Sequence, residues 1–234
     1  MSTEILCHSD ADAIPLLRLL QLASPTLPVG AYSYSEGLET LVETKVVANE
    51  SQLQHWLEWE LAWGSTPIDV AMVTRAYRAV EQGNCERLRD WNMWWSAARE
   101  TAELRAQSWQ MGRSLARLLQ ELDPITKTWL EAVGLPCNFA IAYGLAAACW
   151  RVDLPSALLA YLQSWASNAI GAGVKLIPLG QTAGQRLLFQ LDTHIATTVA
   201  RVIELDDADL SSCSWGVAMA SSQHETQTVR LFQS

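Results

Sequence analysis

Apolar residues recur at helical spacing along almost the whole chain, and this pattern is the feature that most constrains its fold. Trp56, Trp59 and Trp63, for example, stand at positions i, i+3 and i+7, which places them on one face of a helix. Strand-like runs are few: the run 174–177 is too short to build a sheet, and no hairpin dipeptide separates alternating segments. We therefore predict an all-α protein, a single helical-bundle domain of about ten helices with no significant sheet.

Capping and helix-breaking residues predict several helix boundaries. The Ser24-Pro25 pair ends a first helix, and Asp123-Pro124 ends a long polar one that starts near residue 96. Ser33 and Glu36 have the spacing of a capping box, which predicts a helix start there. Asn84 is expected to cap a later helix. Further helices are expected over residues 126–133, 137–150, 156–170 and 182–205.

The chain is expected to have three segments. Residues 1–12 form a flexible N-terminus, and residues 13–210 form the helical domain. Residues 211–234 form a serine-rich, weakly periodic tail, which we expect to fold onto another surface.

The charge balance excludes one class of partner. The formal net charge is −9, which argues against a protein that reads nucleic acid. The charge is uneven, with −8 over residues 1–69, +2 over residues 70–127 and −3 over residues 128–234. This asymmetry indicates either complementary faces for a protein partner or ordinary solubilising charge.

The cysteine pattern and the chain start predict a cytoplasmic protein. Five scattered cysteines without a C-x-x-C pair are typical of a reducing compartment, and the N-terminus lacks the pattern of a signal peptide. Residues 154–174 carry no formal charge and are long enough to span a bilayer. A polar patch at helical spacing favours a buried helix instead, so we expect no membrane association; it comprises Gln163, Ser164, Ser167 and Asn168.

The catalytic motifs that we tested are incomplete. His224-Glu225 could begin a zinc-protease motif, but residue 228 is Thr in place of the second histidine. The segment 171–175 has glycines and a lysine but no phosphate-binding loop, so we expect no nucleotide binding by this chain. We predict no catalytic residue, no cofactor and no metal ligand. Two alternatives stay open: a metal-dependent helical enzyme using the aspartates at 206–209, and a helical bundle that binds a small molecule.

Four blocks of sequence resemble the urease accessory protein UreF family. They are Leu19–Glu39, Arg99–Arg105 followed by Met111–Leu119, Val174–Arg186, and His224–Gln227 with Arg230–Phe232. The blocks occur in order over nearly the whole chain. The resemblance implies an all-α, homodimeric, non-enzymatic chaperone. It would bridge UreD (also called UreH), which contacts apo-urease, and the GTPase UreG, which carries nickel, during nickel insertion.

The resemblance also assigns roles to individual residues. Tyr34, Glu36 and Lys175 are expected on the face presented to UreG, although the capping box could use the Glu36 carboxylate fully. The tail is expected to become ordered against UreD, or else to be a frayed terminus; its contact residues are Arg230, Leu231 and Phe232.

Two further groups are expected to have structural roles. Three loop residues should set a helix-loop-helix geometry: Pro178, Gly180 and Gly184. The tryptophan stripe is expected in the core or in the dimer interface.

Overall fold

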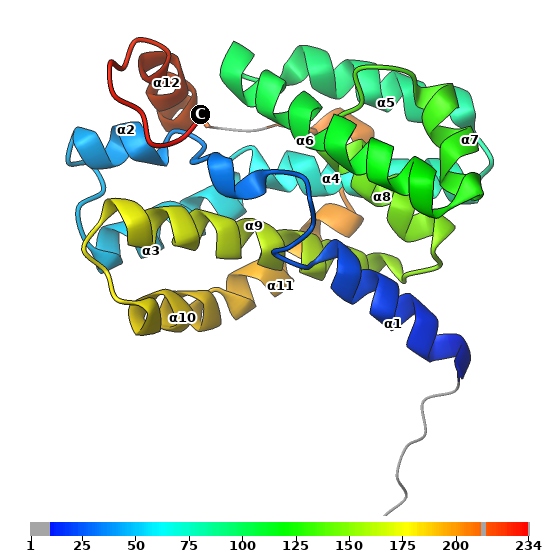
Figure 1. Cartoon of the computed structure of the whole chain (residues 1–234), viewed down its shortest axis with the longest axis horizontal. Helices are drawn as coiled ribbons and strands as arrows, with labels where there is room; N and C mark the ends of the chain where they lie inside the picture. The colour runs from blue at the N-terminus through cyan, green and yellow to red at the C-terminus, as the bar shows by residue number, and fades with distance from the viewer. Residues whose placement is uncertain (1–9, 212–213, 234) are drawn as a thin grey trace, which may run out of the picture.

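The structure is a computed structural model that describes residues 10–211 and 214–233 (Figure 1). Within these residues all regular secondary structure is helical and there is no strand, which confirms the predicted all-α class, and there are slightly more helices than expected. The helices are α1 (Asp10–Leu22), η1 (Ala31–Ser33, 3-10), α2 (Leu38–Glu43), α3 (Glu50–Trp63), α4 (Thr66–Glu81), α5 (Cys85–Ala98), α6 (Ala102–Leu122), α7 (Pro124–Val133), α8 (Phe139–Cys149), α9 (Leu154–Leu176), α10 (Gln181–Gln190), α11 (Asp192–Ile203), η2 (Asp207–Asp209, 3-10) and α12 (Trp215–His224).

Helices α4 and α8 pack against each other at the centre of the molecule (Figure 1). Gly144 of α8 allows the close approach, because a Cβ atom there would lie 2.4 Å from the Val73 carbonyl oxygen of α4. Helices α5, α6 and α7 lie on one side of this pair, and α3, α9, α10 and α11 lie on the other. Almost every residue of α8 is buried, which explains its continuous apolar sequence.

Local capping explains the start of α5, which the sequence predicted, and the start of α7. The Asn84 side chain accepts a hydrogen bond from the Arg87 N–H, as predicted. Asp123, which was predicted only to end the preceding helix, also starts α7, because its side chain accepts a hydrogen bond from the Ile125 N–H. The expected helix over 182–205 is wrong as a single element, because α10 and α11 meet at the fully buried Leu191. The segment 174–176 belongs to α9.

The capping box at Ser33 and Glu36 is also wrong. Ser33 ends η1, and α2 begins only at Leu38, after a left-handed turn in which Glu36 has φ +54° and Gly37 has φ +82°. Gly37 packs directly on α12, since an added Cβ would lie 3.1 Å from Ala220 Cβ. Tertiary packing therefore sets this turn and frees the Glu36 side chain from capping.

The described part of the tail folds back onto the helical body. Helix α12 packs against α2 and α6, and the chain then continues to residue 233 beside α2 (Figure 1). Only 5% of Phe232 is exposed, so the end of the tail contributes to the core.

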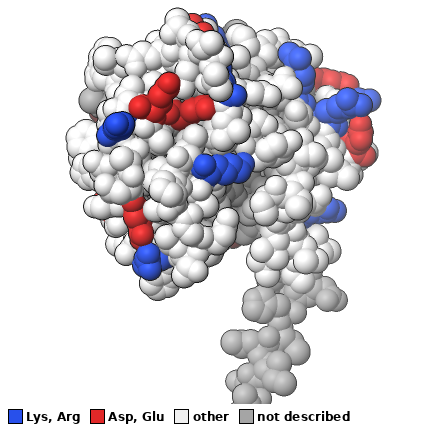
Figure 2. Space-filling model, turned by 60° about the vertical axis from the view of Figure 1, so that its left-hand side comes forward, with Lys and Arg blue, Asp and Glu red and all other residues white. Residues whose placement is uncertain are grey.

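Helix α1 projects from the body (Figures 1 and 2). The segment 1–12 was expected to be flexible. Residues 1–9 of it lie outside the described residues, and α1 begins at Asp10. The solvent-facing side of α1 carries four exposed apolar side chains: Ile14, Leu16, Leu17 and Leu20. In the described part of the chain, no helix has both the length and the apolar character needed to cross a membrane.

The uneven charge of the sequence does not gather into one patch on the face shown in Figure 2. Acidic and basic side chains lie there in small mixed groups, separated by wide uncharged surface. A partner that docks on this face would therefore meet mainly uncharged groups.

Candidate partner-binding site

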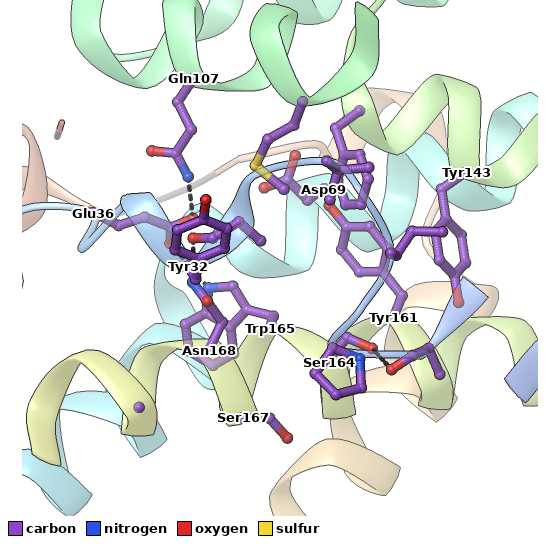
Figure 3. Close-up of a pocket in the computed structure, with 18 of the residues that line it drawn as sticks. Tyr32, Glu36, Asp69, Gln107, Tyr143, Tyr161, Ser164, Trp165, Ser167 and Asn168 are labelled. Carbon is purple, nitrogen blue, oxygen red and sulfur yellow. Dashed lines mark hydrogen bonds between the residues drawn. The ribbon is translucent and has the colours of Figure 1, made fainter. Parts of the chain in front are cut away.

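A pocket of about 300 Å³ lies between α9, α6 and the segment that joins α1 to α2. We call it the Glu36 pocket. Aromatic rings from α8 and α9 form much of its wall (Figure 3). The rings of Phe139, Tyr143 and Tyr161 pack together with centroid distances of 5.0–6.1 Å. Their packing gives the pocket a rigid apolar side.

The Glu36 carboxylate lies on the polar side of this pocket. Gln107 Nε2 donates to Glu36 Oε1 at 2.8 Å, and Trp165 Nε1 donates to Glu36 Oε2 at 2.9 Å (Figure 3). Asn168 Nδ2 donates to the Ala31 carbonyl oxygen at 2.9 Å and so fixes η1 against α9. Helices α6 and α9 thus hold the carboxylate from opposite sides.

Asp69 and Arg99 form a buried ion pair deeper in the pocket. Arg99 NH1 lies 3.5 Å from Asp69 Oδ2, and Trp95 Nε1 donates to Asp69 Oδ1 at 2.8 Å. Burial raises the pKa of Asp69 to about 6; Arg99 opposes this rise, and the Glu36 carboxylate adds to it. The negative charge of Glu36 therefore acts on groups beyond its hydrogen-bond partners.

A second polar cluster holds the tail. His224 is fully buried, with Nε2 3.2 Å from Glu39 Oε2 and Nδ1 3.1 Å from Glu103 Oε2. Glu39 also accepts hydrogen bonds from the backbone N–H groups of Leu231 at 2.7 Å and Phe232 at 3.0 Å. Arg230 NH1 lies 3.2 Å from Glu103 Oε1. The two carboxylates of this cluster thus join α2, α6, α12 and the chain end.

The tail cluster meets the Glu36 pocket at Lys175. The Lys175 Nζ atom lies 5.4 Å from the centroid of the Phe232 ring, and Lys175 also lines the pocket. The Gln233 N–H donates to the Ser33 carbonyl oxygen at 2.8 Å, next to η1. The end of the tail therefore contacts Lys175, which lines the pocket, and Ser33, which follows the lining residue Tyr32.

A comparison with protein families identifies this architecture, since residues 47–192 match the family model described as UreF. The chain belongs to the UreF family. It is 57% identical over 218 residues to the urease accessory protein UreF of Trichormus variabilis, covering 93% of this chain and 95% of that protein. It is 52% identical to the urease accessory protein UreF of Microcystis aeruginosa, over 95% of this chain and 99% of that protein. The urease accessory protein UreF of Azoarcus sp. is 45% identical to this chain, over 94% of this chain and 96% of that protein.

These findings confirm the family that the sequence blocks indicated. The structure brings two of the three residues expected on the UreG face to one pocket, Glu36 and Lys175. Tyr34 is buried, and burial raises its pKa.

The three residues expected on the UreD face differ in exposure. Leu231 is 64% exposed, Arg230 is exposed while its guanidinium pairs with Glu103, and Phe232 is buried against the body. Only Leu231 and Arg230 thus present side chains to solvent.

The three expected loop residues lie at the turn from α9 to α10. Pro178 is in the connecting segment, and Gly180 directly precedes the first residue of α10. Gly184 packs on α9, where an added Cβ would lie 3.2 Å from methyl groups of Ile170 and Val174.

The tryptophan stripe on α3 does not form the core face of that helix. Leu53, Leu57 and Leu61 are fully buried, whereas Trp63 is 57% exposed and stacks on the Arg201 guanidinium at 5.6 Å. The placement of the stripe in the core is therefore wrong, with only Trp56 packing against core residues. Its role as a dimer interface stays a prediction.

One of the aspartates at 206–209, Asp207, contacts arginines. Asp207 pairs with Arg75 at 2.9 Å and also with Arg87. Over residues 10–211 and 214–233, no group of three or more His, Cys, Asp or Glu side chains is arranged to hold a metal ion.

The sequence did not predict which side chains contact Glu36 and His224. Glu39 and Glu103 lie in two of the blocks that resemble the family, and His224 lies in a third, but nothing local to each block indicates that they meet. Gln107 lies between the two segments of the second block and carries no pattern of its own. Only the tertiary structure shows that Gln107 donates a hydrogen bond to the Glu36 carboxylate.

Proposed function

We propose that this protein is a non-enzymatic urease accessory protein that acts in the cytoplasm as a homodimer. It bridges a UreD-type (UreH-type) subunit, which contacts apo-urease, and a UreG-type GTPase, which carries nickel. Family membership and the names of the relatives support the accessory role. The observation that carries the bridging role is the contact between Lys175 and Phe232, which joins the two expected partner surfaces.

This contact supports coupling between the two binding events. A UreD-type partner that engages the exposed Leu231 also acts on Phe232, the next residue. Phe232 is tied to Glu39 through its backbone and lies against the Lys175 ammonium. A change in the tail therefore alters the surroundings of Lys175, so that binding of one partner biases binding of the other.

The exposed apolar side of α1 supports the homodimer. Four large aliphatic side chains project from the body on one short helix, and a contiguous apolar surface of this kind is typical of a protein interface. Two copies that pack through α1 would remove these side chains from water. We therefore place the dimer contact at α1.

Co-expression with UreD-type and UreG-type partners, followed by size-exclusion chromatography, tests this function. We expect a complex containing all three proteins in fixed stoichiometry, with two copies of this chain. Elution of this protein alone, with neither partner in its fractions, would contradict the bridging role. Replacing Leu17 and Leu20 by Ser should convert the dimer to a monomer that retains its helical circular dichroism.

A further inference from the structure

His224 is an ionisable side chain that is completely buried between two carboxylates. Its Nε2 atom lies 3.2 Å from Glu39 Oε2 of α2, and its Nδ1 atom lies 3.1 Å from Glu103 Oε2 of α6. A carboxylate only accepts hydrogen bonds, so both contacts are hydrogen bonds only when both ring nitrogens carry a proton. In a neutral ring, the second nitrogen would turn its lone pair towards a carboxylate oxygen. The arrangement therefore favours the imidazolium form.

The charges around the ring favour the same form. Glu39 and Glu103 face it from α2 and α6, and the tail contributes Arg230, whose NH1 atom lies 3.2 Å from Glu103 Oε1. Within residues 10–211 and 214–233, Glu39 forms no ion pair except the one with His224. Two carboxylates, one guanidinium and one imidazolium sum to zero charge. A neutral ring would leave a mostly buried carboxylate without a cation, which is unfavourable.

Three other charged groups lie near the tail. Glu43 of α2 accepts a hydrogen bond from a tail amide, and the Lys175 ammonium of α9 lies over the Phe232 ring. Glu225 follows His224 directly and is exposed. In the described part of the chain, none of the three forms an ion pair or hydrogen bond with the His224 ring. None of them therefore replaces the positive charge when the ring loses its proton.

The two carboxylates that flank the ring also hold the end of the tail. Glu39 accepts hydrogen bonds from the backbone N–H groups of Leu231 and Phe232, and Glu103 pairs with Arg230. A carboxylate that turns away from an unprotonated ring nitrogen gives up the tail bonds that it accepts. The attachment of the tail thus depends on the proton of the ring.

Helix α12 has a separate attachment to the body. The hydroxyl groups of Ser221 on α12 and of Thr101, the residue before α6, are hydrogen-bonded at 2.8 Å and buried. Gly37 also packs closely against α12. Neither hydroxyl changes its charge near neutral pH. The tail can therefore detach while α12 stays docked.

We propose that His224 is a pH-sensitive switch that controls the docking of residues 225–233 on α2 and α6. The docked tail holds one proton that the released tail does not need. Docking is therefore favoured as the pH falls and is lost as the pH rises. Release withdraws Phe232 from the core and from the Lys175 ammonium. The inference goes beyond the proposed function, because it concerns this chain alone.

Fluorine NMR of the full chain tests the switch, because its three phenylalanines report on different places. Phe232 anchors the tail, Phe139 lines the Glu36 pocket in the body, and Phe189 is 78% exposed. The chain is labelled with 4-fluorophenylalanine, and Phe232→Leu assigns the tail resonance. The pH is raised from about 5 to about 9.5, a range that includes the ordinary titration of histidine at about 6.5.

We expect only the Phe232 resonance to move, towards the position of the exposed Phe189. The ratio of docked to released tail should fall by up to about tenfold per pH unit, the limit for a single proton. Histidine labelled with ¹⁵N gives an independent readout, and both ring nitrogens of His224 should be protonated while the tail is docked.

Glu103→Gln separates the switch from simple attachment. The glutamine amide can donate to an unprotonated Nδ1 of His224, while its oxygen accepts from Arg230, so the tail should stay docked over the whole range. His224→Gln removes the titrating ring, and the docked fraction should become independent of pH. His194→Gln, at an exposed histidine, is the matched control and should keep the wild-type transition.

A second titrating group requires its own control. Burial raises the pKa of Glu60 to about 8, so the body also changes protonation in this range. Glu60→Gln should nevertheless keep the transition of the Phe232 resonance. Loss of the transition in this variant would overturn the assignment to His224.

Four further outcomes would overturn the proposal. They are a Phe232 resonance that stays constant with pH, movement of the Phe139 resonance together with it, a wild-type transition in Glu103→Gln or His224→Gln, and a docked His224 with only one protonated nitrogen. No partner protein takes part in these measurements. Failure of the switch therefore leaves the proposed function in place, and failure of partner capture leaves the switch in place.

Discussion

Lys175 and Phe232 are in contact, with the ammonium nitrogen 5.4 Å from the centroid of the phenyl ring. One residue comes from α9 at the mouth of the Glu36 pocket, and the other is the buried anchor of the tail. A cation over an aromatic face contributes about 0.5–1 kcal/mol at an exposed site. This is small beside the stability of a domain, so the contact can break on binding without unfolding the body.

Removing the ammonium tests the role of Lys175 in partner capture. We expect Lys175→Ala to weaken capture of the UreG-type partner about tenfold, because a charge at the binding face is lost. The unfolding midpoint in urea should change little. Lys127→Ala, at another exposed lysine, should affect neither quantity. Unchanged capture by Lys175→Ala in a quantitative pull-down would exclude Lys175 from the site.

Substitutions at the neighbouring tail residues Leu231 and Phe232 should have different effects, the first on capture of the UreD-type partner and the second on the free energy of unfolding. Leu231→Ala removes an exposed side chain, so we expect weaker capture of the UreD-type partner with an unfolding free energy within about 0.5 kcal/mol of wild type. Phe232→Ala leaves a cavity in the body, and we expect it to cost about 3 kcal/mol. Urea denaturation and pull-down assays on both variants check this contrast. Similar behaviour of the two variants would contradict the placement of the tail.

His224 is expected to be the main support of the tail. The two ring nitrogens of His224 lie against two different carboxylates, and the single amide nitrogen of glutamine cannot take both places, so His224→Gln should lose at least one of these contacts. We expect a loss of about 3 kcal/mol, measured by urea denaturation, together with faster amide exchange over residues 225–233. His194→Gln, at an exposed histidine, is the control. A wild-type midpoint and wild-type exchange in His224→Gln would show that the cluster does not hold the tail.

Local signals predicted those parts of the fold that local physics determines. Asn84 caps a helix through a bond to a residue three positions away, so the sequence alone locates this start. The turn at Glu36 and Gly37 depends instead on contact with α12, nearly two hundred positions further along the chain. The same contact turns a predicted capping carboxylate into a pocket carboxylate. Family resemblance indicated Glu36 and Lys175, whereas their common pocket required the packed structure.

The buried Glu60 gives a prediction on the pH dependence of stability. Its pKa is raised to about 8 in the folded chain, mainly by burial, from 4.5 for the unperturbed group. Between these values the unfolded chain loses the proton while the folded chain keeps it. The folded state thus binds more protons, and stability falls as the pH rises from 4.5 towards 8, by up to about 1.4 kcal/mol per pH unit.

Substitution by glutamine isolates this contribution, because the amide does not titrate. Asp69 acts in the same direction, but its folded pKa of about 6 confines its effect to lower pH. We therefore expect Glu60→Gln to flatten the decline in unfolding free energy between pH 6 and pH 8, measured by urea denaturation at several pH values. Glu121→Gln, at an exposed carboxylate, should keep the wild-type decline. If Glu60→Gln declined as steeply as wild type, Glu60 would be ionised in the folded protein, and its burial between α3 and its neighbours would have to be compensated by a cation.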